Sequence, residues 1–210
     1  MKNQDLIEKQ LKNIKEELKE SPESAKLLHD LGVGYFLLGQ YGNAVIQLKK
    51  ALKQDPKKVS YHFNLANTYS ENDQPELAIQ SYLDALERDP GHVPSLNNLA
   101  DAYEISGQPE KAHELFQYIV KLEPNTPLPH FNLGNFFLRQ NQHIEAAKCY
   151  EEVLRIDETF TDAYYNIAWI LYKAKAFEKS LYYAEKGLVI EDDHNDLLQL
   201  VQSLKKELSR

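Results

Sequence analysis

Four asparagines recur at intervals of 34 residues along the 210-residue chain, at Asn64, Asn98, Asn132 and Asn166. A side-chain amide carries both donors and acceptors, so a row of amides can pair with the peptide groups of an extended chain. Asparagine is a mediocre helix former, and its return at one position therefore requires an explanation. Besides peptide binding, two explanations stay open: retention of an ancestral residue after duplication, and a hydrogen bond from each amide to a neighbouring helix. Asn67 and Asn135 extend the same row.

The residues around this row change in charge along the chain. Apolar residues come first (Val33, Phe36, Leu37), acidic ones follow (Glu71, Asp101, Glu104), and the basic residues are Arg139 and Lys173. Such a gradient would orient an extended ligand and favour a basic residue near its middle. A chance cluster of charges on a solvated helix face is the alternative.

Aromatic side chains occur on the same predicted helix faces as the asparagines, at Phe63, Phe131, Tyr165 and Trp169. Aromatic rings bury much apolar area and are typical anchors of a binding surface, so we expect them to anchor a ligand. For Tyr165 and Trp169, contact with the last helix of the chain is an open alternative.

The residues needed for other chemistry are missing or scattered. Cys149 is the only cysteine, the seven histidines are dispersed, and no glycine-rich phosphate loop follows a strand. A formal net charge of −8 opposes nucleic-acid binding, which depends on Lys and Arg. We therefore expect no catalytic residue, no metal site, no cofactor and no nucleic-acid partner.

The elements that position these residues follow from the same 34-residue period. The dipeptides Asp55-Pro56, Asp89-Pro90 and Glu123-Pro124 are spaced by it without insertion. Five copies are predicted, at residues 25–58, 59–92, 93–126, 127–160 and 161–194. In each copy, small and large residues recur at helical spacing in two segments, which predicts two amphipathic helices. Between them stand Gly39, Asp73, Gly107, Asn141 and Lys175, of which only Lys175 is not a type that tolerates a left-handed backbone.

The repeated residues resemble the tetratricopeptide repeat. In the first copy the match is carried by Leu28, Leu31, Gly32, Tyr35, Ala44, Leu48, Ala51 and Pro56. The later copies depart from the pattern at His62, His130, Glu158, Ala184, Gly187 and Asp192. The resemblance implies an all-α, right-handed solenoid whose first helices line a concave groove. It also implies an asparagine ladder like the one that long members of the family use to hold peptide backbones.

The two ends of the array are predicted to be helical. Residues 195–210 carry Leu197, Val201, Leu204 and Leu208 on one stripe, which predicts a capping helix. Residues 1–24 carry a stripe from Ile7 to Leu18, which fits either a cap or a short coiled coil that would join two copies of the chain. The first 20 residues lack the apolar run of a signal peptide or a membrane span, so we expect a cytoplasmic protein without membrane insertion.

Together these features predict a non-enzymatic adaptor that holds an extended peptide of another protein in its groove. The alternative is a scaffold that assembles with itself through its terminal helix or through end-to-groove contacts. Family members that clamp the acidic tails of chaperones need Lys at the fifth position of a repeat. This chain has His29, Phe63, Asn97, Phe131 and Tyr165 there, so we expect no binding of such tails.

Overall fold

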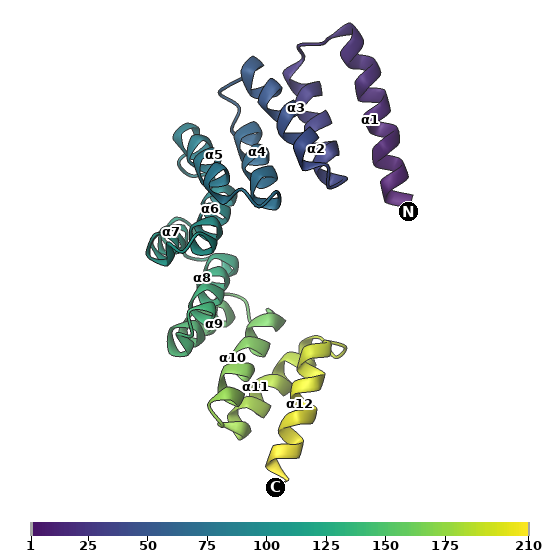
Figure 1. The fold of residues 1–210 in the computed structure, drawn as a ribbon. Coiled ribbons are helices and arrows are strands. Elements are labelled where there is room, and N and C mark those ends of the chain that lie inside the picture. Colours follow the sequence, from purple (N-terminus) through teal and green to yellow (C-terminus); the bar gives the residue numbers. More distant parts are fainter. Residues whose placement is uncertain (1, 210) are drawn as a thin grey trace. The chain divides into compact units, whose positions relative to one another are not determined.

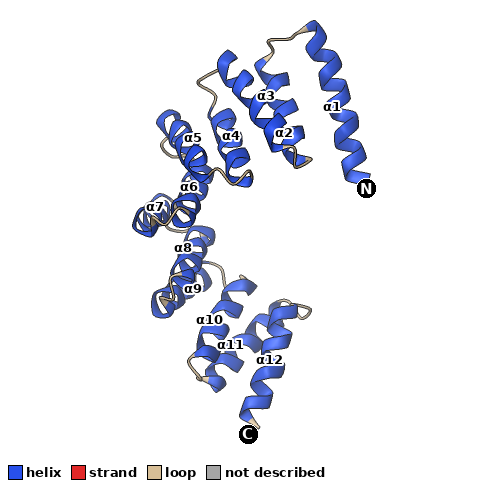
Figure 2. Ribbon diagram, in the orientation of Figure 1, coloured by secondary structure: helices blue, strands red, loops and turns tan. Residues whose placement is uncertain are grey.

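The protein is described from a computed structural model, which places residues 2–209 and the side chains of residues 4–209. Within that range the chain forms twelve α-helices joined by short turns, and no strand (Figure 2). The all-α prediction is confirmed. The helices are α1 (Lys2–Glu20), α2 (Ala25–Leu37), α3 (Tyr41–Gln54), α4 (Val59–Glu71), α5 (Pro75–Arg88), α6 (Val93–Ile105), α7 (Pro109–Leu122), α8 (Pro127–Arg139), α9 (His143–Ile156), α10 (Thr161–Lys173), α11 (Phe177–Ile190) and α12 (Asn195–Leu208).

The chain divides into two compact units, and the division falls inside α7, between Leu115 and Phe116. In unit 1, α2 packs against α3 and α4 against α5, while α1 lies beside α2 (Figure 1). In unit 2, α8 packs against α9 and α10 against α11, and α12 packs against α11. The helices α2, α4, α6, α8 and α10 are called the first helices below, because each opens a helix-turn-helix pair.

A left-handed residue joins the two helices of every pair. Gly39, Asp73, Gly107 and Asn141 all have positive φ, between 55° and 75°. Lys175 adopts the same conformation, with a φ of 59°, although its side chain has a β-carbon that opposes it. The turn geometry is therefore repeated at all five positions, including the one where the residue type does not favour it.

Close approach of the two helices in a pair depends on small residues. Ala44, Ala78, Ala112 and Ala146 have no exposed surface. A β-carbon added to Gly32 would lie 2.7 Å from Leu48, and one added to Gly134 would lie 2.7 Å from Tyr150. Both distances are too short for real atoms, so at these two glycines a methyl group would force the neighbouring side chain to move.

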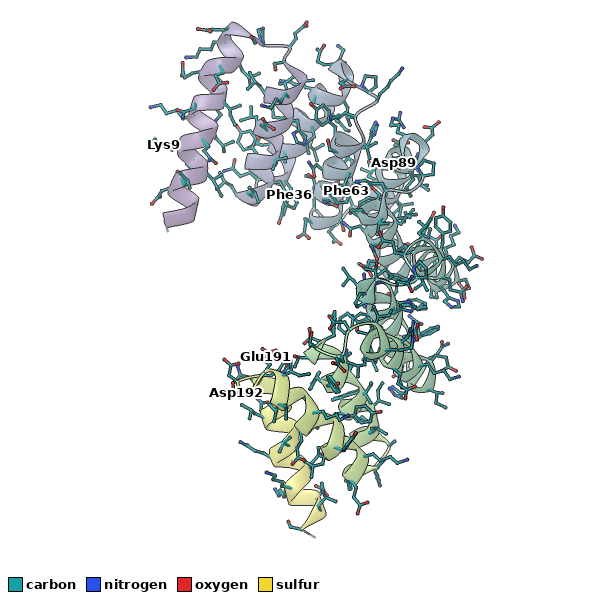
Figure 3. The ribbon with its side chains drawn as sticks, turned by 180° about the vertical axis from the view of Figure 1, so that it is seen from behind. Lys9, Phe36, Phe63, Asp89, Glu191 and Asp192 are labelled. Atoms are coloured by element: carbon teal, nitrogen blue, oxygen red, sulfur yellow. The ribbon has the colours of Figure 1, made fainter. Side chains whose placement is uncertain are left out.

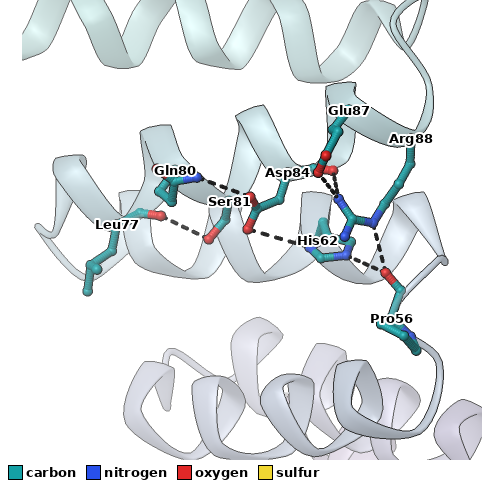
Figure 4. Close-up of polar contacts among 8 residues, drawn as sticks. All are labelled: Pro56, His62, Leu77, Gln80, Ser81, Asp84, Glu87 and Arg88. Carbon is teal, nitrogen blue, oxygen red and sulfur yellow. Dashed lines mark hydrogen bonds and ion pairs between the residues drawn. The ribbon is translucent and has the colours of Figure 1, made fainter.

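Two histidines replace the apolar residue expected at the fourth position of a repeat, and each bonds to the preceding repeat. His62 Nε2 lies 2.9 Å from the carbonyl oxygen of Pro56, and Arg88 donates to the same oxygen at 2.8 Å (Figure 4). His130 Nε2 lies 3.0 Å from the carbonyl oxygen of Pro124 in the same way. The two histidines that depart from the apolar pattern thus each form a hydrogen bond to the backbone of the preceding repeat.

Each terminal helix packs onto a glycine of its neighbour. Leu11 of α1 is buried and lies directly over Gly34 of α2. Leu197 of α12 is fully buried, and a β-carbon added to Gly187 would lie 2.6 Å from it. None of the helices between residues 2 and 209 combines the length and the apolar character that crossing a bilayer requires.

Candidate peptide-binding face

In unit 1 the predicted asparagines form a hydrogen-bonded set with a buried tyrosine. The Tyr82 hydroxyl donates to Asn67 Oδ1 at 2.6 Å, and Asn98 Nδ2 donates to the same oxygen at 2.9 Å. Both lone pairs of that oxygen are then used, which fixes the orientation of the Asn67 amide. The Asn67 Nδ2 group and the Asn98 Oδ1 atom have no partner among the described residues, and both side chains are half-buried.

Asn64 takes part in a second set, one repeat earlier. Its Nδ2 lies 2.7 Å from His29 Nε2, while His29 Nδ1 lies 3.1 Å from Asp30 Oδ1. The neutral imidazole satisfies both contacts, because it donates from Nδ1 to the carboxylate and accepts at Nε2 from the amide. The ring also stacks on Tyr61, with the centroids 4.5 Å apart. This arrangement fixes the Asn64 amide and leaves neither ring nitrogen of His29 for a metal.

Three adjoining clefts lie along this side of unit 1. The first, of about 400 Å³, is bounded by Ile7, Leu11 and Ile14 of α1 and by Val33 and Leu37 of α2. A small one of about 120 Å³ continues from Val33 and Leu37 to Asn64 and Asn67.

The third cleft, of about 300 Å³, runs from Phe36 and Asn67 to Asn98, Asp101 and Ile105. Neighbouring clefts share lining residues, so together they form one trough across α1, α2, α4 and α6. Phe36, at the junction of the second and third clefts, is labelled on its helix in Figure 3.

The trough changes in character from one end to the other. Its α1/α2 end is apolar, and Leu37 there is 60% exposed. Its α4/α6 end holds the carboxylates of Glu71 and Asp101 around the Tyr82 phenol. Burial, and to a lesser extent these two negative charges, raise the pKa of Tyr82 to about 12, so the phenol stays a hydrogen-bond donor at neutral pH.

Unit 2 repeats one part of this arrangement. The Tyr150 hydroxyl donates to Asn135 Oδ1 at 2.7 Å, and burial raises the pKa of Tyr150. Asn132 and Asn166 are half-buried on α8 and α10, and Arg139 is exposed at the end of α8.

Three of the predicted aromatic anchors pack against rings of the same unit. Phe63 lies 5.3 Å from His92 between centroids, Phe131 lies 4.9 Å from Phe160, and Tyr165 lies 6.0 Å from His194. In every case the second ring belongs to the last residue of the same repeat. Tyr165 also packs against the cluster that contains Leu197 and Leu204 of α12. Each ring is half-buried, so part of its surface remains accessible.

Trp169 and Lys173 lie together near the end of α10. The Lys173 ammonium lies 5.1 Å from the indole centroid. The ring of His143, on the neighbouring helix α9, lies 6.0 Å from the indole ring between centroids. A cleft of about 580 Å³ next to them is lined by Ile144, Ile170 and Lys173. Trp169 itself is half-buried against the core of unit 2.

Cys149 on α9 is the single cysteine of the chain, and it is half-buried. Burial raises the pKa of the Cys149 thiol to about 11, so it is protonated at neutral pH. Over residues 2–209 there is no cluster of three or more His, Cys, Asp or Glu side chains able to hold a metal ion.

Two hydrogen-bonded pairs were not predicted from the sequence, although their signal is present there. Tyrosine stands at the twenty-fourth position of a repeat only where asparagine stands at the ninth, as in Asn67 with Tyr82 and Asn135 with Tyr150. The two residues are 15 apart, on the two helices of one pair, and they bond in both cases.

Three family models match parts of the chain. They are described as "TPR repeat" at residues 32–73, "Tetratricopeptide repeat" at residues 63–128, and "Cilia and flagella-associated protein 70 middle TPR-like domain" at residues 96–197. No curated protein matched the sequence.

Several solved structures have the same fold. PilF of Pseudomonas aeruginosa is 25% identical with a TM-score of 0.70, and the match covers 90% of this chain and 86% of that one. MamA is 23% identical with a TM-score of 0.67, over 81% of this chain and 93% of that one. YrrB, described as a TPR protein with an unusual peptide-binding site, is 21% identical with a TM-score of 0.63, over 89% and 96% of the two chains.

Proposed function

The chain belongs to the tetratricopeptide repeat family, and on that premise we propose that it is a non-enzymatic adaptor that binds an extended segment of a partner protein along its first helices. The observation that carries the proposal is the shared acceptor Asn67 Oδ1. Because Tyr82 and Asn98 both donate to it, the Asn67 amide presents its N–H groups and Asn98 presents its carbonyl oxygen within one cleft. A donor and an acceptor held in this way match the N–H and C=O groups of a peptide backbone.

Preorganisation is what makes these amides suitable for binding. A free asparagine loses rotamer entropy when it binds, whereas Asn67 and Asn98 are already held by hydrogen bonds inside the protein. Asn64 is held in the same way by His29. The bonds within the protein are therefore compatible with a ligand-binding row, since each amide keeps hydrogen-bonding groups beyond those already used.

Apolar and aromatic residues add the contacts that backbone pairing lacks. In unit 1 these are Phe36, Leu37 and the exposed part of Phe63. In unit 2 we propose the same role for Phe131, Tyr165 and Trp169, with Asn132, Asn135 and Asn166 as the polar row and Arg139 and Lys173 as its basic flank. Backbone pairing by the amides would give affinity, and these side chains would give selectivity.

The proposal is tested by panning a random peptide display library, about 12 residues long and so able to span the trough, on the full chain. Peptides enriched on the wild type are then measured by fluorescence anisotropy against an Asn67→Ala, Asn98→Ala double variant. We expect at least about tenfold weaker binding, the loss of roughly two hydrogen bonds.

The matched control is Asn43→Ala, which removes an amide from α3 that bonds only to Gln40. It should bind like the wild type. Circular dichroism and thermal unfolding establish that all variants are folded. A folded double variant with wild-type affinity for every enriched peptide would show that the asparagines are structural only.

The alternative function, self-assembly, requires the apolar stripe of α1 to contact a second copy of the chain. Leu11 is buried against Gly34 within the chain, so this part of the apolar stripe caps α2, while Leu6 on the same helix stays 56% exposed. Light scattering over a hundredfold range of concentration separates the two functions. A constant monomer mass favours the adaptor, and larger species that Leu6→Glu abolishes favour the scaffold.

A further inference from the structure

The ring of His29 on α2 is held in one orientation by three neighbours. Its Nδ1 atom lies 3.1 Å from Asp30 Oδ1, its Nε2 atom lies 2.7 Å from Asn64 Nδ2, and the ring stacks on Tyr61 with the centroids 4.5 Å apart. The His29 side chain is only 16% exposed, so these contacts are largely shielded from water. The ring therefore cannot exchange its two nitrogens without losing the contact to Asp30.

The contact with His29 decides which end of the Asn64 amide meets a ligand. Because Nδ2 is used by His29, Oδ1 is the group left for a ligand in the cleft of about 120 Å³ that Asn64 and Asn67 line together. Asn67 is arranged in the opposite sense, because its Oδ1 already accepts from Tyr82 and Asn98. The two amides of α4 thus offer one acceptor and one donor, which match the N–H and C=O groups of a peptide backbone.

Protonation of His29 would reverse this arrangement at Asn64. An imidazolium donates from both nitrogens, so Nε2 can no longer accept from Asn64 Nδ2, and two donors 2.7 Å apart repel each other. A half-turn of the amide about χ2 places Oδ1 against the Nε2–H group and forms a charge-assisted hydrogen bond. Nδ1 continues to donate to Asp30. Neither Asn64 nor Asn67 then has an oxygen left to accept from a ligand.

The neighbours of the ring come from each helix that packs against α2. On α2 itself, the carboxylate of Asp30 is paired with the ring. From α4, Tyr61 faces the ring, and burial, followed by the charges of Asp55, directly after α3, and of Asp30, raises the pKa of Tyr61, so this phenol is neutral at pH 8 and below. The described α1 residues that share the first cleft with His29 are all uncharged: Ile7, Gln10, Leu11, Asn13 and Ile14.

We propose that His29 is a positioning residue for peptide binding and couples that binding to pH. The neutral ring holds Oδ1 of Asn64 available to the ligand, whereas protonation reverses the amide and weakens binding. The inference rests on the proposed function and adds its regulation. By reciprocity, a peptide that binds the neutral form expels a proton from the protonated form. The coupling is confined to Asn64, because the equivalent residues of the later repeats are not histidines: Phe63, Asn97, Phe131 and Tyr165.

The reversal is tested first in the free, full-length chain by NMR, with histidine and asparagine labelled with nitrogen-15. Histidine is the side-chain type whose charge ordinarily changes between about pH 5 and 8, so this is the range to scan. At the upper end we expect a coupling through the hydrogen bond between Asn64 Nδ2 and His29 Nε2. It should disappear in step with protonation of the ring, while the Asn98 amide, bonded to Asn67, should not follow that titration. A coupling that persists when His29 is protonated would overturn the inference.

The effect on binding is tested with the peptides enriched from the random library, choosing those without His, Asp or Glu so that the ligand itself does not titrate. By fluorescence anisotropy, the wild type should bind about fivefold more weakly at pH 5 than at pH 8, the loss of one hydrogen bond. Calorimetry near pH 6 in two buffers of different ionisation enthalpy should show proton release on binding, which is absent at pH 8. Circular dichroism and light scattering at each pH check that the protein stays folded and in solution.

Three variants separate the charge of His29 from its packing. His29→Gln keeps an acceptor for Asn64 but cannot titrate, so it should bind like the wild type at pH 8 and equally well at pH 5. His29→Phe keeps a ring that can stack on Tyr61 but leaves the amide unheld, so its affinity should lie between the two wild-type values and be independent of pH. His130→Gln is the control, because this histidine bonds to Pro124 and is not in the lining of the trough, and it should keep the wild-type pH dependence.

The outcomes separate this inference from the proposed function. If binding depends on Asn67 and Asn98 but responds to pH equally in the wild type and in His29→Gln, the inference is overturned and the proposed function stands. If no enriched peptide depends on Asn67 and Asn98, the proposed function is overturned and the inference falls with it. A loss of affinity at pH 5 that both His29 variants abolish and His130→Gln retains supports the inference.

Discussion

His62 Nε2 lies 2.9 Å from the carbonyl oxygen of Pro56, six residues earlier in the chain. The bond joins the first helix of one repeat to a proline near the end of the previous repeat, and Arg88 reaches the same oxygen from α5 (Figure 4). His130 and Pro124 form the same bond two repeats later. A polar residue at a position that is normally apolar thus links consecutive repeats through the backbone.

We predict that His62→Ala lowers the free energy of unfolding by about 1–3 kcal/mol, because it removes a hydrogen bond and opens a void at a side chain that is only 7% exposed. Urea denaturation measures the change. His130→Ala is the comparison, since this histidine makes the same bond but is more exposed, and its effect should be smaller. If both substitutions lower the free energy of unfolding equally, the histidine–carbonyl hydrogen bond accounts for the effect and the greater burial of His62 does not.

Lys175→Gly should stabilise the protein by about 1 kcal/mol. A residue with a β-carbon is strained at a φ of 59°, and glycine removes that strain. Gly107→Ala, at a φ of 75°, should destabilise it by a similar amount. Gly42 is the control, because it lies in α3 with open space around it and a helical backbone, so Gly42→Ala should stabilise by about 0.5–1 kcal/mol. Thermal unfolding of the three variants would reveal any reversal of these signs.

Ala78→Leu should destabilise the protein by about 1–3 kcal/mol, because Ala78 has no exposed surface and α4 and α5 pack tightly around it. Ala174→Leu makes the same substitution at an exposed position after α10 and should have little effect. Chemical denaturation of both variants measures the difference. If Ala78→Leu were tolerated, the close approach of helices inferred from the small residues would be wrong.

Stability should fall between pH 10 and pH 12 because of Tyr82. Burial raises its pKa to about 12 in the folded chain, whereas the unfolded chain titrates near 10. Below pH 10 the phenol is neutral in both states and its contribution is fully present. As the pH rises, the unfolded state loses the proton first, so up to about 2–3 kcal/mol is lost by the time the pH passes 12.

Urea denaturation at a series of pH values, in a Cys149→Ala background, checks this expectation. The background substitution removes a thiol whose pKa is itself raised to about 11 by burial. Tyr82→Phe cannot ionise at this position, so its stability should vary less over the same range. An identical slope in both proteins would assign the alkaline loss to other groups.

Much of the fold followed from the 34-residue period, because a helix pair that recurs without insertion leaves few ways to bury its apolar positions. The left-handed turn at Lys175 shows the limit of reading residue types singly. Four other repeats place this conformation at the equivalent residue, and packing of the pair imposes it where the side chain does not favour it.

The site was only partly predictable. Helical periodicity placed Asn64 and Asn98 on the same side as Asn67, but it could not say which residue of the preceding repeat each amide reaches. His29, the partner of Asn64, is 35 residues away, and its ring orientation depends on stacking against Tyr61. Such contacts are decided by the packing between repeats, which a pattern within one repeat does not contain.

The two terminal helices pack onto glycines: Leu11 of α1 lies against Gly34, and Leu197 of α12 lies against Gly187. Gly187 stands where the repeat pattern asks for alanine, and the space it leaves is occupied by Leu197 of the last helix. The end repeats are therefore not interchangeable with internal ones. A version of this protein with fewer or more repeats should therefore lose or gain whole internal repeats. It should keep the first and last repeats, with Gly34 and Gly187, unchanged at its two ends.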